Sequence, residues 1–314
     1  MNRPARLILV ALALAGNALA QGYPAKPIRF IVGPGPDALA RVIGQKLTEA
    51  WGQPVIVDQR GGGGGTISAE AVAKAAPDGY TLLLATGTHT INPSMYKLSY
   101  DMVRDFAPVT LLASTPFILA VHPSVPANSV AELIRLAKAK PGALNYGSGG
   151  SGTPPHLATE LFKTAAGIDI VHVPYKTVAA AITDLVAGQL QVMFTVGPAG
   201  LPQIRAGRLR GLAVSTARRS AFAPDLPTVA ESGLPGFDVF GWNGLLAPAG
   251  TPGSIIARLQ GEIVRALQNS ELRERIASFG FEPVGNTPEE FGEFVKADIA
   301  RWADVVKQSG ARVD

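Results

Sequence analysis

Short apolar strands alternate with amphipathic helices along most of the chain, and this alternation constrains the fold more than any other feature. The predicted strands are Ile28–Val32, Pro54–Asp58, Tyr80–Ala85, Val109–Ala113, Phe117–Val121, Leu144–Gly147, Ile168–Val173, Gln191–Thr195 and Leu209–Ser215. The predicted helices between them are Ala38–Trp51 with Asp37 as its cap, Ile67–Ala75, Val130–Ala139, His156–Ala166 and Val178–Ala187. Such alternation predicts an α/β fold in which helices flank both faces of mostly parallel sheets.

The pattern occurs twice, once up to residue 122 and again beyond it, which predicts two α/β units. A chain of 314 residues suits about two domains. Its content of 47% hydrophobic and 17% charged residues supports folded cores and argues against disorder. The C-terminal third is predicted to be mostly helical. Its final helix has one apolar face, made of Phe291, Phe294, Val295, Ile299, Trp302 and Val306.

The first twenty residues have the composition of a signal peptide. Arg3 and Arg6 are their only charges, an apolar run covers 7–15, and Ala18-Leu19-Ala20 gives a small-x-small cleavage pattern before Gln21. The apolar run is shorter than the roughly 20 residues that a bilayer span needs, which favours a leader over a membrane anchor. We therefore expect export to the periplasm of a Gram-negative bacterium.

Composition excludes several kinds of chemistry. Removing the two leader arginines lowers the net charge from +4 to +2, and no run of Lys and Arg marks a nucleic-acid surface. The chain has no Cys, and it contains neither an H-E-x-x-H nor a G-x-S-x-G sequence. His156 and Glu160, one helical turn apart, are half of a metal site at most, and surface pairing is the favoured interpretation. We therefore predict a protein without cofactor or metal that is not an enzyme.

The segment between Gly147 and Pro155 is the strongest candidate for a ligand site. It follows a predicted strand and opens a helix, where backbone N–H groups, hydroxyls and the helix dipole can hold an anion. A surface turn that binds nothing remains the alternative. The candidate ligand contacts are Ser148, Gly149, Ser151, Gly152 and Thr153.

The same segment matches the dinucleotide fingerprint through Gly147, Gly149 and Gly152. That fingerprint places its third glycine inside the helix and an acidic residue at the end of the next strand. Here two prolines follow at the helix start, and Asp169 lies at the beginning of the next strand. These departures disfavour a dinucleotide.

Two further segments lie where a ligand is expected, beyond the carboxyl ends of strands. The loop after Tyr80–Ala85 offers Thr86, Gly87, Thr88 and His89, although plain loop punctuation is the alternative. Tyr175 and Lys176 end another strand, with Thr177 as the cap of the next helix. Lys176 either places a cation beside an acidic ligand or is simply exposed. The glycine run 61–65 lacks the Gly-Lys-Ser/Thr of a phosphate loop, so we interpret it as a tight connection.

Ordered sequence matches extend through nearly the whole mature chain. They are Tyr23-Pro24-Ala25-Lys26-Pro27-Ile28-Arg29, Gly52-Gln53-Pro54-Val55, Ala76-Pro77-Asp78-Gly79-Tyr80-Thr81-Leu82-Leu83, Asn92-Pro93-Ser94-Met95-Tyr96, Asp105-Phe106-Ala107-Pro108-Val109, His172-Val173-Pro174-Tyr175-Lys176, Leu226-Pro227-Thr228-Val229-Ala230-Glu231 and Ala247-Pro248-Ala249-Gly250-Thr251-Pro252. Through them the chain resembles the Bug family, the TctC-type periplasmic solute-binding proteins of tripartite tricarboxylate transporters.

The resemblance implies a type II Venus-flytrap fold, with two α/β domains joined by two crossing strands and a ligand in the cleft between them. Residues 21–122 and 243–314 are then the first domain, and 123–242 the second. It also implies a small carboxylate ligand, membrane transporter subunits as partners, and a monomeric chain. Family sites hold carboxyl groups with backbone amides, hydroxyls and waters. A ligand-presenting sensor component and a degenerate paralogue with impaired binding remain alternatives.

Three positions depart from the family pattern. In the family, the loop after the first strand contacts a ligand carboxylate, which implies Gly35 and Asp37 as contacts here. In this chain that loop is several residues shorter than the family pattern and lacks its Gly-Gly pair. Thr177 replaces the glycine that usually follows Tyr-Lys. Thr195 replaces a common aspartate, which removes an acceptor for a ligand ammonium group. The resemblance therefore implies a carboxylate without an ammonium group.

Overall fold

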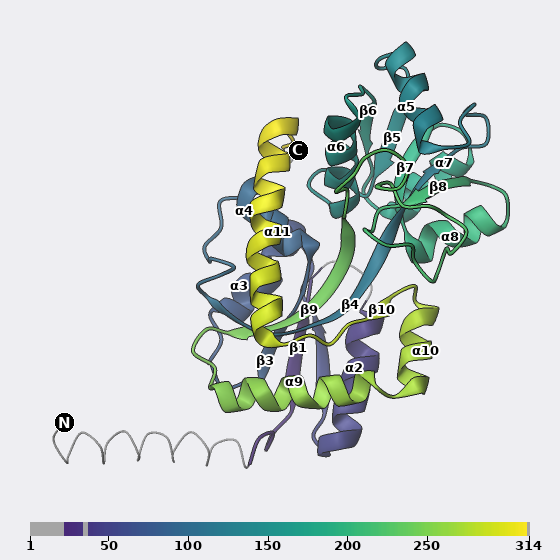
Figure 1. Cartoon of the computed structure of the whole chain (residues 1–314). Helices are drawn as coiled ribbons and strands as arrows, with labels where there is room; N and C mark the ends of the chain where they lie inside the picture. Colours follow the sequence, from purple (N-terminus) through teal and green to yellow (C-terminus); the bar gives the residue numbers. More distant parts are fainter. Residues whose placement is uncertain (1–21, 34–36, 313–314) are drawn as a thin grey trace.

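A mixed β-sheet of ten strands runs through the part of the chain that the computed structural model describes, residues 22–33 and 37–312 (Figure 1). The predicted leader lies outside this part. The strands are β1 (Ile28–Val32), β2 (Val55–Gln59), β3 (Thr81–Thr86), β4 (Phe106–Val121), β5 (Asn145–Ser148), β6 (Val171–Pro174), β7 (Val192–Val196), β8 (Arg210–Val214), β9 (Phe240–Pro248) and β10 (Glu282–Pro283).

Helices connect most of these strands, as the alternation predicts. They are α2 (Ala38–Trp51), the short 3₁₀ turn η1 (Gly63–Gly65), α3 (Thr66–Ala73), α4 (Gly87–Met95), α5 (Val130–Ala139), α6 (Pro154–Ala166), α7 (Val178–Val186), α8 (Gly197–Arg205), α9 (Gly253–Leu267), α10 (Ser270–Ser278) and α11 (Pro288–Ser309). Within the described residues, none of these helices combines the length and the apolarity that crossing a membrane requires.

The first half of the sheet has the order β2-β1-β3-β9-β4. Strands β1, β2 and β3 are parallel, whereas β9 is antiparallel to both β3 and β4. Helices α2 and α9 pack on one face of this half through Leu47 and Leu259, and α3 packs on the other through Val72. This half therefore has helices on both faces, as an open α/β sheet requires.

The second half of the sheet is built on the far end of β4, which pairs with β7 and β8. Strand β5 is parallel to β6 and to β7. Helices α5 and α6 cover one face, where Leu133 and Phe162 join the core, and α7 covers the other through Leu185. The second α/β unit predicted beyond residue 122 is thus present.

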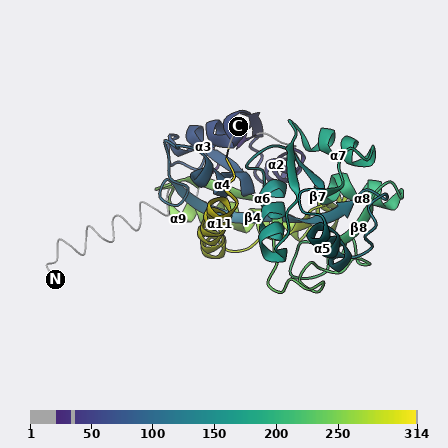
Figure 2. The ribbon, with the colours of Figure 1, turned by 90° about the horizontal axis from the view of Figure 1, so that it is seen from above.

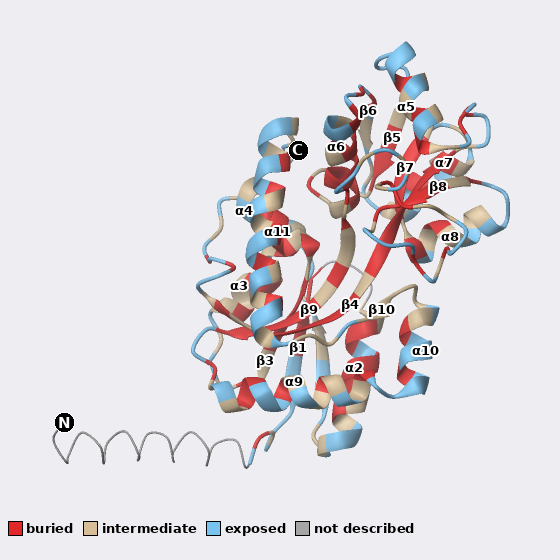
Figure 3. Ribbon diagram, in the orientation of Figure 1, coloured by how far each residue is buried: buried red, intermediate tan, exposed pale blue. Residues whose placement is uncertain are grey.

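Strand β4 is one continuous strand of 16 residues, so the prediction of two strands, Val109–Ala113 and Phe117–Val121, is wrong. Pro116 interrupts the apolar pattern but not the ladder, because Thr115 and Pro116 stay in register with Gly241 and Phe240 of β9. Strand β4 is buried along most of its length in both halves (Figure 3). It therefore links the two halves as a single continuous strand.

The final helix, α11, also spans both halves (Figures 1 and 2). Phe291 and Val295 belong to a core cluster on the first half of the sheet. Trp302 and Val305 belong instead to the core cluster of the second half, and α11 contacts α6 there. The predicted apolar face of this helix is confirmed, but it serves two cores. Together with β4 and β9, α11 gives the chain three connections between the halves.

Candidate functional site

Two of the predicted ligand segments meet where the halves of the molecule adjoin. Helix α4 begins at Gly87, after β3 of the first half, and α6 begins at Pro154, after β5 of the second half. A Cβ atom placed on Gly87 would lie 3.3 Å from Cγ of Pro154. A Cβ atom on Gly152 would lie 3.1 Å from Cε of Met95 at the end of α4. The structure thus brings together two helix N-termini that lie more than sixty residues apart in the sequence.

The predicted loop Thr86–Thr90 is in fact the first turn of α4, which is a correction to the sequence interpretation. Nδ1 of His89 accepts a hydrogen bond from the backbone N–H of Thr86, 3.0 Å away, in the manner of a capping box. Thr90 donates to the Gly87 carbonyl at 2.8 Å. These bonds start a helix at residues whose types are typical of a loop. Thr88 stays partly exposed.

His89 itself points into the first half of the molecule, with 1% of its surface exposed. Its Nε2 lies 3.4 Å from Oγ of Ser68, and a Cβ atom on Gly65 would come within 3.1 Å of the same nitrogen. Burial lowers the pKa of His89 to about 4, so the imidazole is neutral at physiological pH. These contacts give His89 a role in holding the first turn of α4 against the loop that precedes α3.

This burial predicts an acid-dependent loss of stability. The free energy of unfolding that His89 contributes is present above its unfolded-state pKa of about 6.5 and is lost as the pH falls toward 4. The full loss is on the order of 3 kcal/mol. Urea unfolding at pH 7, 5.5 and 4.5 should show a shallower pH slope for His89→Gln than for the wild type. His122→Gln, which replaces a partly exposed histidine beside Ser124, is the matched histidine control. Equal slopes in all three proteins would contradict the prediction.

The loop after β5 is folded back on itself by its own hydroxyl groups. Ser148 is fully buried, and its Oγ accepts from the backbone N–H of Gly150 at 3.2 Å. Thr153 donates to the Gly150 carbonyl at 2.7 Å. Gly150 and Gly152 have φ angles of +123° and +75°, which favour glycine over any residue with a side chain. The hydroxyls of Ser148 and Thr153 therefore shape the loop by binding the backbone of Gly150.

Tyr175 and Lys176 lie beside this loop but differ in environment. The Tyr175 hydroxyl donates to Oδ2 of Asp184 in α7 at 2.6 Å, and burial with that carboxylate raises the pKa of Tyr175 to about 12. The backbone N–H of Tyr175 donates to the Ser148 carbonyl at 3.1 Å. Lys176 is exposed. Thr177 caps α7 by accepting from the N–H of Ala180 at 3.2 Å, which confirms the predicted cap.

Three predicted contacts remain. Gly35 lies outside the described residues. Asp37 precedes α2, but no side-chain cap bond forms: its Oδ2 pairs with Nη2 of Arg41 at 2.6 Å, which holds the pKa of Asp37 below its usual value. The predicted capping role of Asp37 is therefore wrong. Thr195 is fully buried in β7, donates to the Ile118 carbonyl at 3.3 Å and faces Gly200 of α8.

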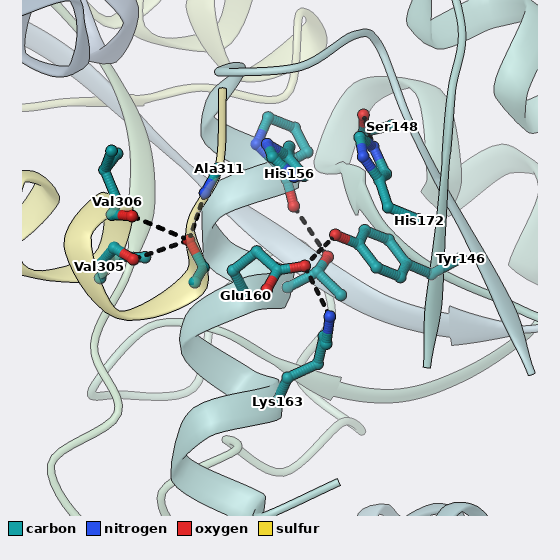
Figure 4. A network of polar contacts seen from close by, with 12 residues as sticks. Tyr146, Ser148, His156, Glu160, Lys163, His172, Val305, Val306 and Ala311 are labelled. Carbon is teal, nitrogen blue, oxygen red and sulfur yellow. Dashed lines mark hydrogen bonds and ion pairs between the residues drawn. The ribbon is translucent and has the colours of Figure 1, made fainter. Parts of the chain in front are cut away.

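A buried polar network lies directly beneath the 148–152 loop (Figure 4). The Tyr146 hydroxyl donates to Oε1 of Glu160 at 2.5 Å, and Lys163 donates to the same oxygen at 2.9 Å. The ring centroids of His156 and His172 are 4.0 Å apart and nearly parallel, and the Tyr146 ring stacks at 4.8 Å from His172.

The sequence interpretation missed this network. In the sequence, only the spacing of His156 and Glu160 pointed to it. The two side chains were expected to pair at the surface, but both are buried and bind different partners. His156 accepts from the backbone N–H of Gly152, whereas Glu160 binds Tyr146 and Lys163. In residues 22–33 and 37–312, no three His, Asp or Glu side chains are grouped so that they could hold a metal ion.

The chain is similar to one protein family and to several solved structures. The model of the family described as "Tripartite tricarboxylate transporter family receptor" (TctC) matches residues 39–311. The structure described as "R. palustris Rpa4515 with adipate" is 38% identical, with a TM-score of 0.82, and covers 93% of this chain and 100% of that chain. MatC from Rhodopseudomonas palustris with bound malate is 32% identical, with a TM-score of 0.77 and coverages of 90% and 100%. The periplasmic binding protein BugD is 31% identical, with a TM-score of 0.78 and coverages of 93% and 100%.

These likenesses extend over nine-tenths or more of each chain, so they concern the whole architecture and not one motif. They confirm the predicted α/β fold of the two-domain, periplasmic-binding-protein class.

Proposed function

Because the chain belongs to the tripartite tricarboxylate transporter receptor family, we propose that it captures a small carboxylate between its two halves and presents it to the membrane subunits of such a transporter. The family and its solved members are described as receptors and binding proteins, so the chain is a solute-binding protein and not an enzyme. The signal-like residues 1–20 and the periplasmic placement of BugD support a periplasmic location for this chain.

The observation that carries the proposal is the meeting of the α4 and α6 N-termini. The first turn of α4 has backbone N–H groups without partners in the helix. Helix α6 begins with Pro154 and Pro155, which have no N–H, so the donors on its side are those of the glycine-rich loop before it. Both helix dipoles favour a negative charge. One N-terminus comes from each half, and a Cβ atom on Gly87 would lie only 3.3 Å from the Pro154 ring. A carboxylate held there would bind amides of both halves at once. We propose Gly87, Thr88, Gly149 and Ser151 as its contacts.

The ligand class follows from what is present at the site and what is not. Two solved relatives hold adipate and malate, which are both dicarboxylates without an ammonium group. At position 195 this chain has a buried threonine whose hydroxyl binds a strand carbonyl, so no carboxylate is offered there to a ligand amine. We therefore propose a dicarboxylate without an amino group. The proposed domains are 21–122 with 243–314, and 123–242, which are linked by β4, β9 and α11.

A binding screen tests this function. Adipate, malate and succinate at a concentration 100 times the dissociation constant should stabilise the folded protein by about 2.7 kcal/mol and raise its melting temperature by several degrees. Titration calorimetry on the mature chain should give one site per molecule. Aspartate, the amino analogue of succinate, should bind more weakly than succinate, and putrescine serves as the cationic control. No binding of any dicarboxylate at millimolar concentration would overturn the proposal, and tighter binding of aspartate would overturn the proposed ligand class.

A further inference from the structure

We propose that His156 and His172 are positioning residues, which together hold both ends of the 148–152 loop in the conformation that receives the ligand carboxylate. The inference rests on the proposed function, because it concerns the same loop. It adds a pair of side chains, His156 buried and His172 partly buried, that do not contact the ligand themselves and act through the loop backbone and Ser148.

Each imidazole binds one end of the loop. Nε2 of His172 lies 2.7 Å from Oγ of Ser148, at the point where β5 ends and the loop begins. Nδ1 of His156 accepts a hydrogen bond from the backbone N–H of Gly152, 3.1 Å away, where the loop leads into α6. Because the two rings stack at 4.0 Å with an angle of 18° between their planes, the two ends of the loop are joined through one stacked pair.

The pair is itself held in place from below. Tyr146 stacks on His172 at 4.8 Å, and its hydroxyl is fixed by Glu160, which Lys163 also binds (Figure 4). His156 and Tyr146 are both buried, and so is Glu160. The rings therefore have little freedom to tilt, and the nitrogen atoms that bind the loop have fixed positions.

The loop needs such support because of its own composition. Residues 147–152 are four glycines and two serines, and glycine loses more conformational entropy on ordering than any other residue. Gly150 and Gly152 have positive φ angles. The hydroxyls of Ser148 and Thr153 hold Gly150, whereas the N–H of Gly152 is held by His156. A binding loop that is ordered before the ligand arrives binds more tightly, because binding then loses no conformational entropy in ordering the loop. The histidine pair supplies this order through two hydrogen bonds.

Paired amide substitutions separate positioning from simple core packing. The amide group of asparagine occupies roughly the place of Nδ1 in histidine, whereas that of glutamine reaches the place of Nε2. His156→Asn and His172→Gln therefore keep the polar atom that binds the loop, and His156→Gln and His172→Asn displace it. All four variants remove the ring stack, so each retaining variant is a matched control for its displacing partner.

The measurement is the dissociation constant for the dicarboxylate that the wild type binds best, taken with the melting temperature of each unliganded variant. We expect His156→Asn and His172→Gln to stay within about threefold of each other, and both displacing variants to bind at least tenfold more weakly than their partners. The backbone N–H of Gly152 should keep its protection from hydrogen exchange in His156→Asn and lose it in His156→Gln. Equal weakening of all four variants, or unchanged binding in all four, would overturn the inference in favour of a packing role.

Ser148→Ala keeps the experiment decisive if a histidine variant does not fold. It removes the partner of His172 without changing the ring stack. We expect at least tenfold weaker binding, and no further loss when His172→Asn is added. Additive losses would overturn the inference. A wild type that binds no dicarboxylate would overturn the proposed function and this inference with it. If the wild type binds a dicarboxylate but the retaining and displacing variants bind it equally well, this inference alone is overturned.

Discussion

Replacing Trp302 with alanine is expected to lower the free energy of unfolding by about 4 kcal/mol. The Trp302 side chain is 2% exposed and lies in the core cluster of the second half of the molecule, together with Phe162 and Phe194. Its helix, α11, is anchored to the first half by Phe291 and Val295. The substitution therefore leaves a cavity at the place where α11 attaches to the second half. Urea unfolding monitored by circular dichroism measures the loss.

Val306→Ala is the matched control for Trp302→Ala. Val306 lies on the same stretch of α11 and packs against the same cluster, but it is only partly buried. We expect this change to cost about 1 kcal/mol. Limited trypsin digestion should also cleave the end of α11 faster in the tryptophan variant than in the valine variant. Equal losses in the two variants would show that α11 is not anchored through Trp302.

Asp298→Leu is the second substitution with a large expected cost, up to about 3 kcal/mol. The Asp298 carboxylate is 4% exposed and accepts hydrogen bonds from Oγ1 of Thr90 at 2.7 Å and from Nε1 of Trp242 at 3.1 Å. Leucine would leave Nε1 of Trp242 buried without an acceptor, at about 1–3 kcal/mol, and would leave the Thr90 hydroxyl only the Gly87 carbonyl. Because Thr90 lies in the first turn of α4, ligand affinity should fall together with stability. Urea unfolding and calorimetric titration measure the two effects.

Asp298→Asn separates the hydrogen bonds from the charge. Asparagine keeps a carbonyl acceptor, so we expect a much smaller loss than with leucine. Burial raises the pKa of Asp298 above its usual value, so the folded protein holds this proton to a higher pH than the unfolded chain does. The wild type should therefore gain stability relative to Asp298→Asn as the pH falls through this raised pKa toward the ordinary value of 3.8. A stability difference that is constant with pH, or an asparagine variant as unstable as the leucine one, would contradict this account.

The sequence predicts those helices and strands whose local hydrophobic pattern matches the burial of their residues in the fold. Helix α2 has the predicted bounds, because its apolar stripe repeats at helical spacing and Gly52 ends it in a left-handed conformation. Strand β9 was missed, since Gly241, Asn243 and Gly244 lower its strand propensity. The reason for Gly244 is tertiary: a Cβ atom there would lie 2.1 Å from Cζ of Phe291 in α11. No local pattern contains that contact.

The candidate site shows the same division. The ends of β3 and β5 could be located from the sequence, because helix starts after strands are where anions bind. That α4 and α6 touch through Gly87 and Pro154 depends on how the two halves are joined, which local patterns do not reveal. Sequence patterns also do not show where a side chain points. The hydroxyls of Ser148 and Thr153 point toward the loop's own backbone, and His89 points into the core.

The place of β9 in the sheet has a consequence for the order in which the protein can fold. Strand β9 lies between β3 and β4, yet more than a hundred residues separate it from both along the chain. A growing chain that ends before Phe240 has no partner for the inner edge of β3, and the first half cannot close. Native pairing at the centre of the sheet is therefore long-range and late. For the periplasmic location that we propose, this arrangement would leave the chain unfolded during export, because its central ladder cannot form until most of the polypeptide has emerged.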